Sequence, residues 1–334
     1  MKFLLIFLFI ACVYTLDKDI NQDQCEDLCS FDVNEIDISK FLIGTTEEKK
    51  QIATLFDQAF HQHGVIRLIN ANITSAIIDK TKEFFALDEK LKLKYYGNGS
   101  YYGTPGYKPP GLEAVGNYKG DKKTAPTDSN EIYFTFFKAQ SKEIDPSIDQ
   151  LPDVFRQAVP EYILKGRQLI SDVHQIADLA LELNENILDK NYTSDHATFT
   201  LRLAKYYPPK HDEPLSLGEH QDYLGFTLIH NDDVPGLEVN VNGRWFGVES
   251  KPKTIIVVGG EFIQRWTNDY WISVLHRVGA VHQLRYSALL FSGPDMNSVI
   301  DTLPCEKCTL EPSKYPPITV YEHMEKRNAA AARN

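Results

Sequence analysis

The segment HQDYLGFTLIHNDDVPGLEVNVNGRWFGV, residues 220–248, carries the clearest secondary-structure pattern in this sequence. Asn242 and Gly243 lie between two short apolar runs, Leu237–Val241 and Trp245–Val248. An Asn-Gly pair in that setting is the strongest short-range signal for a β-hairpin. Further short strand patterns lie at residues 199–203, 254–258 and 285–291. Many short strands joined by turns that contain Gly and Pro are typical of a sandwich or jelly roll.

Helical patterns precede these strands. Thr45 and Glu48 form a capping box that begins a helix, and an apolar stripe with helical spacing follows it. Further helices are predicted at about residues 74–85 and after Pro152, the second one interrupted early by Pro160. The sequence therefore predicts a mixed α+β chain. Its parts are a mixed helical region at residues 16–185, a jelly-roll core at 186–300 and a C-terminal extension at 301–334.

The composition is that of an ordinary globular protein, with 43% hydrophobic and 24% charged residues. The 35 basic and 46 acidic side chains give a net charge of −11. Because an acidic chain repels phosphate backbones, nucleic acid is not expected as a partner. No internal apolar run approaches the roughly 20 residues of a membrane span, so we expect no membrane association after the N-terminal segment is removed.

The N-terminus predicts entry into the secretory pathway. Lys2 precedes an apolar run from Phe3 to Leu16, which is typical of a signal peptide. Val13 and Thr15 suit the −3 and −1 positions of a cleavage site, so residues 1–15 are expected to be removed; an uncleaved anchor is the alternative. We therefore expect a protein of the secretory pathway or a secreted one. Three sequons support this localisation, with acceptors at Asn72, Asn98 and Asn191.

Four cysteines remain after the predicted cleavage, as the pairs Cys25/Cys29 and Cys305/Cys308. In an oxidising compartment, an even number of cysteines indicates two disulfides, and three connectivities stay open. Pairing across the termini would close a long loop and add about 5 kcal/mol in the chain-entropy model. A zinc site with four thiolate ligands is the alternative.

Three side chains form a candidate metal site. His220 and Asp222 would share a face of one strand, and His276 follows later in the chain. Two histidines and one carboxylate are typical of non-haem Fe(II) sites, which keep positions open for O₂ and a co-substrate. Arg285 and Ser287 also share a strand face. A buried guanidinium needs an anion, so the pair suits a carboxylate.

These motifs resemble those of the 2-oxoglutarate/Fe(II)-dependent dioxygenase family, of the isopenicillin N synthase-like type. The similarity covers nearly the whole mature chain. Residues 33–39 resemble the family's IPVIDLS stretch, 203–209 its NYYP strand, 220–229 its HTDxxxLTLL motif, 273–278 its S-LHRV motif and 285–287 its R-x-S motif.

The resemblance implies a double-stranded β-helix, or jelly roll, wrapped by N-terminal helices. It also implies Fe(II) and 2-oxoglutarate as co-substrate, with ascorbate as an optional addition. The residues that it implicates are His220, Asp222 and His276 as iron ligands, Arg285 and Ser287 for the far carboxylate of 2-oxoglutarate, and Tyr207 near its metal-bound end. The expected reaction oxidises a small organic substrate, most simply by hydroxylation, with release of succinate and CO₂. Desaturation and ring closure remain alternatives.

Some residues depart from the family pattern. Lys205 replaces the usual Asn of the NYYP strand, and we hypothesise that it pairs with a carboxylate of the substrate. Val258 and Glu261 replace the Asn and Asp of the family's VN-GD strand. None of these changes removes a candidate iron ligand.

Three other functions stay open. The first is an iron oxidase like isopenicillin N synthase, which does not use 2-oxoglutarate and which the R-x-S pair does not exclude. The second is a secreted, non-catalytic jelly roll that binds a small ligand or a partner. The third is a zinc hydrolase on the same three ligands, which offers no reason for Arg285 and Ser287. The sequence does not predict the oligomeric state.

Overall fold

The computed structural model describes residues 30–73, 76–97, 104–112, 128–184, 186–208 and 215–332. The predicted signal peptide, Cys25, Cys29 and the sequon acceptor Asn98 lie outside the described residues. Among the helices of the described part, none combines the length and the apolar character needed to cross a membrane.

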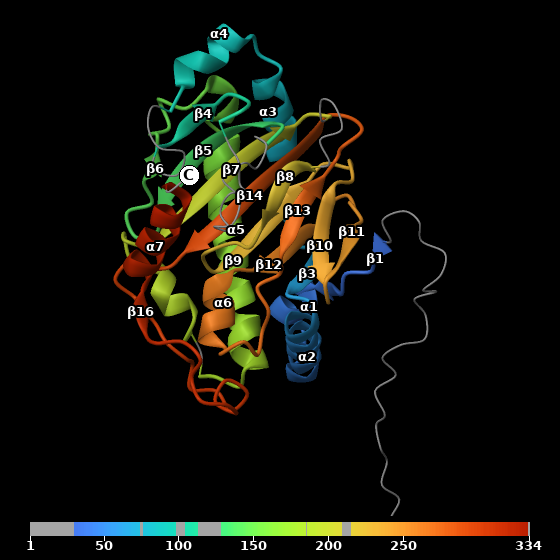
Figure 1. The fold of residues 1–334 in the computed structure, drawn as a ribbon, viewed down its shortest axis with the longest axis vertical. Coiled ribbons are helices and arrows are strands. Elements are labelled where there is room, and N and C mark those ends of the chain that lie inside the picture. Colours follow the sequence, from blue (N-terminus) through green and yellow to red (C-terminus); the bar gives the residue numbers. More distant parts are fainter. Residues whose placement is uncertain are drawn as a thin grey trace, which may run out of the picture.

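Two β-sheets face each other at the centre of the molecule (Figure 1). The larger sheet has the strand order β2-β3-β12-β9-β14-β7-β5-β4, with β6 beside β5, and the smaller one has the order β1-β11-β10-β13-β8. A third, two-stranded sheet pairs β15 with β16. The strands are β1 Ser30–Phe31, β2 Glu35–Asp37, β3 Val65–Ile69, β4 Gly106–Lys108, β5 Asn130–Lys138, β6 Ile144–Asp145, β7 Thr198–Tyr206, β8 Leu215–His220, β9 Phe226–Asn231, β10 Leu237–Val241, β11 Arg244–Val248, β12 Ile255–Gly259, β13 His276–Gly279, β14 Arg285–Gly293, β15 Val299–Ile300 and β16 Ile318–Thr319.

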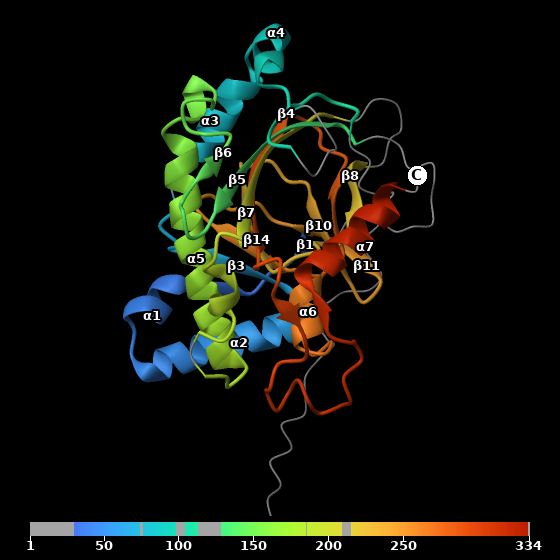
Figure 2. The same cartoon turned by 90° about the vertical axis from the view of Figure 1, so that its left-hand side faces the viewer.

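Helices cover the outer face of the larger sheet. Figure 2 shows α3 and α5 along one side of the strands and α2 running below them. The α-helices are α1 Ile38–Ile43, α2 Thr46–Gln62, α3 Ala76–Phe85, α4 Glu89–Lys92, α5 Ala158–Ala180, α6 Glu261–Trp266 and α7 Val320–Ala332. Short 3₁₀ turns lie at Leu93–Tyr95, Asp153–Phe155 and Asp189–Tyr192. The predicted jelly roll with N-terminal helices is confirmed.

Two apolar cores result from the alternation of side chains along the strands. One core lies between the two facing sheets and includes Ala204, Leu217, Val239 and Leu289. The other lies between the larger sheet and the helices and includes Leu203, which neighbours Ala204 in sequence and points the opposite way. Strands of the larger sheet are therefore buried on both faces.

Several local predictions are confirmed. Thr45 caps α2 and forms the complete capping box with Glu48. Asn242 and Gly243 have φ angles of 52° and 82°, as the hairpin turn between β10 and β11 requires. Pro160, in contrast, does not interrupt a helix, because it lies in the first turn of α5, where an amide hydrogen would have no partner in the helix.

The structure adds two elements to the sequence analysis. Strand β5 pairs with β7 along its whole length, so the predicted helical region contributes a long strand to the larger sheet. The Ala-rich tail from Asn328 continues α7 to Ala332. Thr319 and Glu322 form a second capping box at its start, since the Glu322 amide donates to Thr319 Oγ1 and the Thr319 amide donates to Glu322 Oε2.

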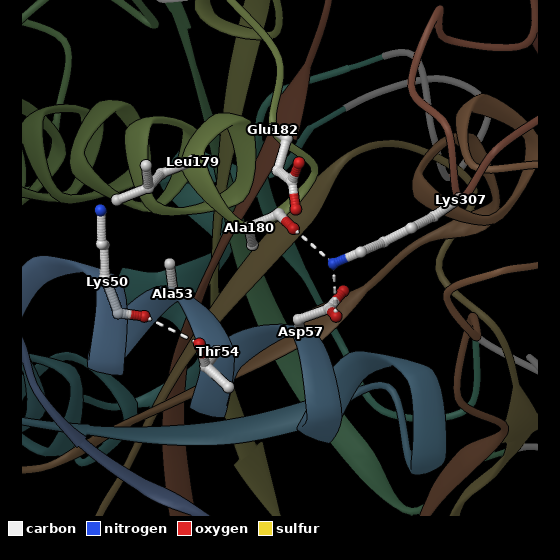
Figure 3. A pocket seen from close by; sticks show the side chains of 8 residues that line it. All are labelled: Lys50, Ala53, Thr54, Asp57, Leu179, Ala180, Glu182 and Lys307. Carbon is white, nitrogen blue, oxygen red and sulfur yellow. Dashed lines mark hydrogen bonds and ion pairs between the residues drawn. The ribbon is translucent and has the colours of Figure 1, made fainter.

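The segment after β15 is tied to the helices. Cys305 and Cys308 are joined by a disulfide, so these two cysteines pair locally and not across the termini. Between them, Lys307 donates from Nζ to Asp57 of α2 and to the carbonyl oxygen of Ala180 at the end of α5 (Figure 3). The C-terminal extension is therefore anchored on the helical layer.

A buried carboxyl group in α5 predicts a pH dependence of stability. Burial raises the pKa of Asp178 to about 6, although its Oδ1 accepts a hydrogen bond from the Leu188 amide. Between about pH 4 and 6 the folded state keeps a proton that the unfolded state has lost. The free energy of unfolding should therefore fall as the pH rises through this window.

Asp178→Asn should flatten that decline and raise the free energy of unfolding at pH 7, because it keeps an acceptor oxygen and removes the buried charge. Urea unfolding at pH 4, 5, 6 and 7 measures the effect. Glu161→Gln, on the exposed side of the same helix, is the control and should keep the decline. Parallel curves for Asp178→Asn and the unchanged protein would contradict the prediction.

Candidate active site

Three side chains from two segments of the chain converge on one point. His220 ends β8 and is paired with His276 at the start of β13, and their ring centroids lie 4.2 Å apart. Asp222 Oδ1 lies 3.9 Å from His220 Nε2 and 3.8 Å from His276 Nε2. One ligand atom from each of the three lies within 4.8 Å of the others. These separations exceed hydrogen-bond lengths and suit three donors around one ion.

Hydrogen bonds fix the orientation of both imidazoles. The Nδ1 atoms of His220 and His276 lie 2.9 Å from the carbonyl oxygen of Gly218 and 3.1 Å from that of Val274. A carbonyl only accepts, so both Nδ1 atoms carry the proton and both Nε2 atoms can act as ligands. Asp222 is 6% exposed and its Oδ2 has no hydrogen-bond partner among the described residues. This buried carboxylate therefore fits a cation.

The prediction that His220 and Asp222 share one strand is wrong. Strand β8 ends at His220, and Asp222 lies in the loop that follows. The loop is held from outside, since the Glu261 amide at the start of α6 donates to the Asp222 carbonyl oxygen at 2.8 Å. The two side chains converge because the chain turns there.

The predicted cation lies in the interior between the two sheets. On β14, Arg285 is opposite Tyr206 and Ser287 is opposite Ala204. Arg285 is 1% exposed, and its Nη2 donates to Asn231 Oδ1 at 2.6 Å. Arg285 Nε and Nη1 and Ser287 Oγ have no hydrogen-bond partner among the described residues. Burial lowers the pKa of the Arg285 guanidinium. A charged donor and a hydroxyl side by side fit a carboxylate of a bound small molecule.

Gly236 makes room for this cation. A Cβ atom at Gly236 would lie 3.1 Å from Arg285 Cδ and 3.0 Å from Val281 Cγ1, and the residue has a φ of +156°. The glycine of the Pro-Gly-Leu motif therefore lets the backbone lie close to the Arg285 side chain.

Tyr207 does not lie in this site, which contradicts its predicted role near the metal-bound end of 2-oxoglutarate. Its hydroxyl donates to Glu131 Oε1 at 2.5 Å on the face of the larger sheet that the helices cover. Tyr206 is the tyrosine on the interior face, and its ring centroid lies 5.1 Å from Arg285 Cζ. The motif contains two adjacent tyrosines, and successive residues of a strand point to opposite faces.

Lys205 also faces the helices, which contradicts the hypothesis that it pairs with a substrate carboxylate. Its Nζ lies 3.1 Å from Glu131 Oε1 and donates to the Phe85 carbonyl oxygen. Glu131 is 1% exposed and also accepts hydrogen bonds from Lys92 and Tyr107. Burial opposes ionisation of Glu131, but these donors outweigh it and lower its pKa. The group is a buried ionic network of the fold.

Two family models match the chain. The model of the 2OG-Fe(II) oxygenase superfamily matches residues 198–294, which include all three converging side chains, Arg285 and Ser287. The model of the non-haem dioxygenase in morphine synthesis N-terminal region matches residues 33–152. The chain belongs to the 2-oxoglutarate- and Fe(II)-dependent oxygenase family.

Relatives of known activity support this membership. Leucoanthocyanidin dioxygenase of Malus domestica is 29% identical over 272 residues, which cover 78% of this chain and 73% of that protein. The 2-oxoglutarate-dependent dioxygenase gloF of Glarea lozoyensis is 28% identical, over 85% of this chain and 94% of that protein. A full-length Neurospora crassa protein, solved in complex with alpha-KG, is 26% identical with a TM-score of 0.76, over 89% of this chain and 96% of that one.

This oxygenase therefore uses Fe(II) and 2-oxoglutarate and oxidises a small organic substrate. The residues present fit both groups. Three oriented donors converge on one point, and donors on Arg285 and Ser287 that no described residue pairs with lie between the same sheets. Among the described residues, sequence reasoning missed Tyr206 and Asn231 at this site. Both were visible in the sequence, but only the strand register places them beside Arg285.

The corrected register gives opposite expectations for the two tyrosines. Tyr206→Leu removes the ring that faces the Arg285 guanidinium, so it should raise the KM for 2-oxoglutarate several-fold. Tyr207→Leu removes a donor to a buried carboxylate, so it should lower the free energy of unfolding by about 1.5–3 kcal/mol and leave this KM within twofold. Steady-state kinetics and urea unfolding of both variants measure this, and the reverse pattern would contradict the register.

Proposed function

We propose that this oxygenase couples the oxidative decarboxylation of 2-oxoglutarate to the hydroxylation of a small organic substrate. One 2-oxoglutarate, one O₂ and one substrate C–H group give succinate, CO₂ and a C–OH group, so atoms and electrons balance. The observation that carries the proposal is a set of buried donors on Arg285 and Ser287 that have no partner among the described residues. They lie between the same sheets as the His220, Asp222 and His276 triad.

Each residue has a distinct role in this proposal. His220, Asp222 and His276 would hold Fe(II), because their donor atoms converge on one point. When bound, the iron would supply the activation of O₂. Arg285 Nε and Nη1, with Ser287 Oγ, bind the far carboxylate. Asn231 holds the third guanidinium nitrogen and so fixes the orientation of this donor set.

The surroundings keep this region dry. Leu217, Val239, Ile229 and Leu289 line the interior between the sheets and are at most 7% exposed. Such walls strengthen the pairing of Arg285 with a carboxylate, because the pair lies away from water. They also protect reactive species from side reactions with solvent.

The alternative functions have less support. The similar structure that holds alpha-KG favours 2-oxoglutarate use over an oxidase of the isopenicillin N synthase kind. A non-catalytic binding protein would have no need for three oriented metal donors. A zinc hydrolase would leave the donors of Arg285 and Ser287 without a function.

The names of similar proteins favour a cyclic substrate. They include leucoanthocyanidin dioxygenase and a structure of the Neurospora crassa protein that holds thymine and is 25% identical to this chain. We therefore propose a small ring compound, which accepts the hydroxyl on the ring or on a carbon attached to it.

A screen for succinate release tests this function. Purified protein with Fe(II), ascorbate and 2-oxoglutarate should release succinate faster when the true substrate is added, and a panel of ring compounds should begin with leucoanthocyanidin and thymine. His220→Ala should abolish the release. Arg285→Lys keeps the charge but loses the two-pronged donor, so it should raise the KM for 2-oxoglutarate at least tenfold.

Two results would contradict the proposal. One is substrate oxidation without any succinate, which would indicate the oxidase. The other is an unchanged KM for 2-oxoglutarate in Arg285→Lys, which would place the co-substrate elsewhere.

We also propose that the chain enters the secretory pathway. The signal-like residues 1–15 support this, as does the disulfide between Cys305 and Cys308. Asn72 is exposed and can accept a glycan. Asn191 is less suitable, because its Nδ2 donates to the carbonyl oxygens of Ile187 and Leu188.

Expression of the full chain in a eukaryotic secretory host tests this localisation. The mature protein should begin at Leu16 and shift in mobility on treatment with an N-glycosidase. Asn72→Gln should remove one glycan, whereas the matched change Asn191→Gln should remove none. An intact Met1 with no glycan would contradict secretion.

A further inference from the structure

Helix α7 is the last element of the described chain, and its position is well defined. The capping box at Thr319 and Glu322 begins it, and β16 before it pairs with β15. The Val320 amide donates to the Ser298 carbonyl oxygen, and Met324 packs against the helix-covered core. Figure 2 shows α7 running across α6. Helix α7 is therefore an integral part of the fold.

An ionic cluster joins α7 to α6. Glu261, the first residue of α6, has a side chain that is only 12% exposed. Its Oε2 accepts from Arg327 Nε at 3.0 Å and lies 2.9 Å from His323 Nε2, while its Oε1 accepts from Arg327 Nη2. The ring of Phe262 packs 4.9 Å from that of His323. A two-pronged pair with a third partner holds geometry better than a single exposed ion pair.

The same two residues of α6 contact the loop that carries Asp222. The Glu261 amide donates to the Asp222 carbonyl oxygen at 2.8 Å, and the Phe262 amide donates to the Leu224 carbonyl oxygen at 3.1 Å. The Arg327 guanidinium lies 5.4 Å from the ring centroid of Tyr223, the residue after Asp222. Gln221, on the other side of Asp222, lines the same surface hollow as Glu261, His323 and Arg327. The start of α6 and Arg327 of α7 therefore contact the loop at Asp222, Tyr223 and Leu224.

We infer that Glu261 and Arg327 are positioning residues for Asp222, and that docking of α7 sets the geometry of its carboxylate. This role rests on the metal site proposed above and adds the C-terminal helix to it. A strand would hold Asp222 through its ladder of hydrogen bonds, but Asp222 lies in a loop. Its place therefore depends on the contacts that α6 and α7 make with that loop. Groups that orient metal ligands typically change metal affinity by 10–100-fold.

Calorimetric titration of the metal-free full chain with Mn(II) alone tests the inference. Arg327→Leu and Glu261→Gln should each raise the Kd for Mn(II) about tenfold. The double variant should raise it no further, because both changes break one contact. Arg327→Lys keeps the charge and loses the two-pronged geometry, so it should give a smaller rise. The matched control is Lys326→Leu, which removes a charge from the exposed side of the same helix and should leave the Kd unchanged.

Hydrogen exchange provides a second readout. Coupling between two sites is reciprocal, so Mn(II) should slow amide exchange in α7 of the unchanged protein and should not do so in Arg327→Leu. Thermal unfolding of the metal-free variants checks that they are folded. If Arg327→Leu does not fold, Arg327→Lys replaces it in the comparison.

The outcomes separate the two proposals. Equal Kd values for the unchanged protein, Arg327→Leu and Arg327→Lys would overturn the role of α7, while loss of binding in His220→Ala would leave the metal site standing. If the unchanged protein bound no Mn(II), the proposed function itself would be overturned.

Discussion

The pairing of β7 with β14 is the constraint on which the site depends. It places Tyr206 opposite Arg285 and Ala204 opposite Ser287, with all four side chains between the sheets. A shift by one residue would turn each of these side chains to the opposite face. The register is strongly specified, because both faces of β7 are buried and each takes a different set of partners. The interior face presents Ala204 and Tyr206 to the core between the sheets, and the outer face presents Lys205 to the ionic network around Glu131.

The free-energy cost of burying a charge explains how the two faces of strand β7 differ. Around Glu131, two lysines and two tyrosines satisfy the carboxylate within the protein, so that network is complete without a ligand. Arg285 donates from Nη2 to Asn231, and its Nε and Nη1 have no partner among the described residues. Unmatched donors on a buried cation destabilise the free protein, and a bound carboxylate removes that cost. Arg285 is thus the buried charged group whose hydrogen bonding a ligand would complete.

Much of this could be predicted from the sequence, because the signals were local. The hairpin at Asn242-Gly243, the capping box at Thr45, and the spacing of Arg285 and Ser287 all depend on neighbours within a few residues. The choice between Tyr206 and Tyr207 could not be predicted from the sequence. Two adjacent tyrosines fit the motif equally well, and only the pairing across strands distinguishes them. Strand β5 was missed for a related reason. Both of its faces are buried, so it lacks the alternation of apolar and polar residues that reveals a half-exposed strand.

The position of Asp222 shows the same limit at the metal site. Its identity follows from the HxD motif, but its place is set by contacts with α6, and through Glu261 with α7, both distant in sequence. The histidines differ, because the paired strands β8 and β13 hold them directly. Two of the three donors are thus fixed by the core, and the third depends on elements added around it. Variation in the C-terminal extension can therefore alter the geometry of the site without changing any residue of the motif.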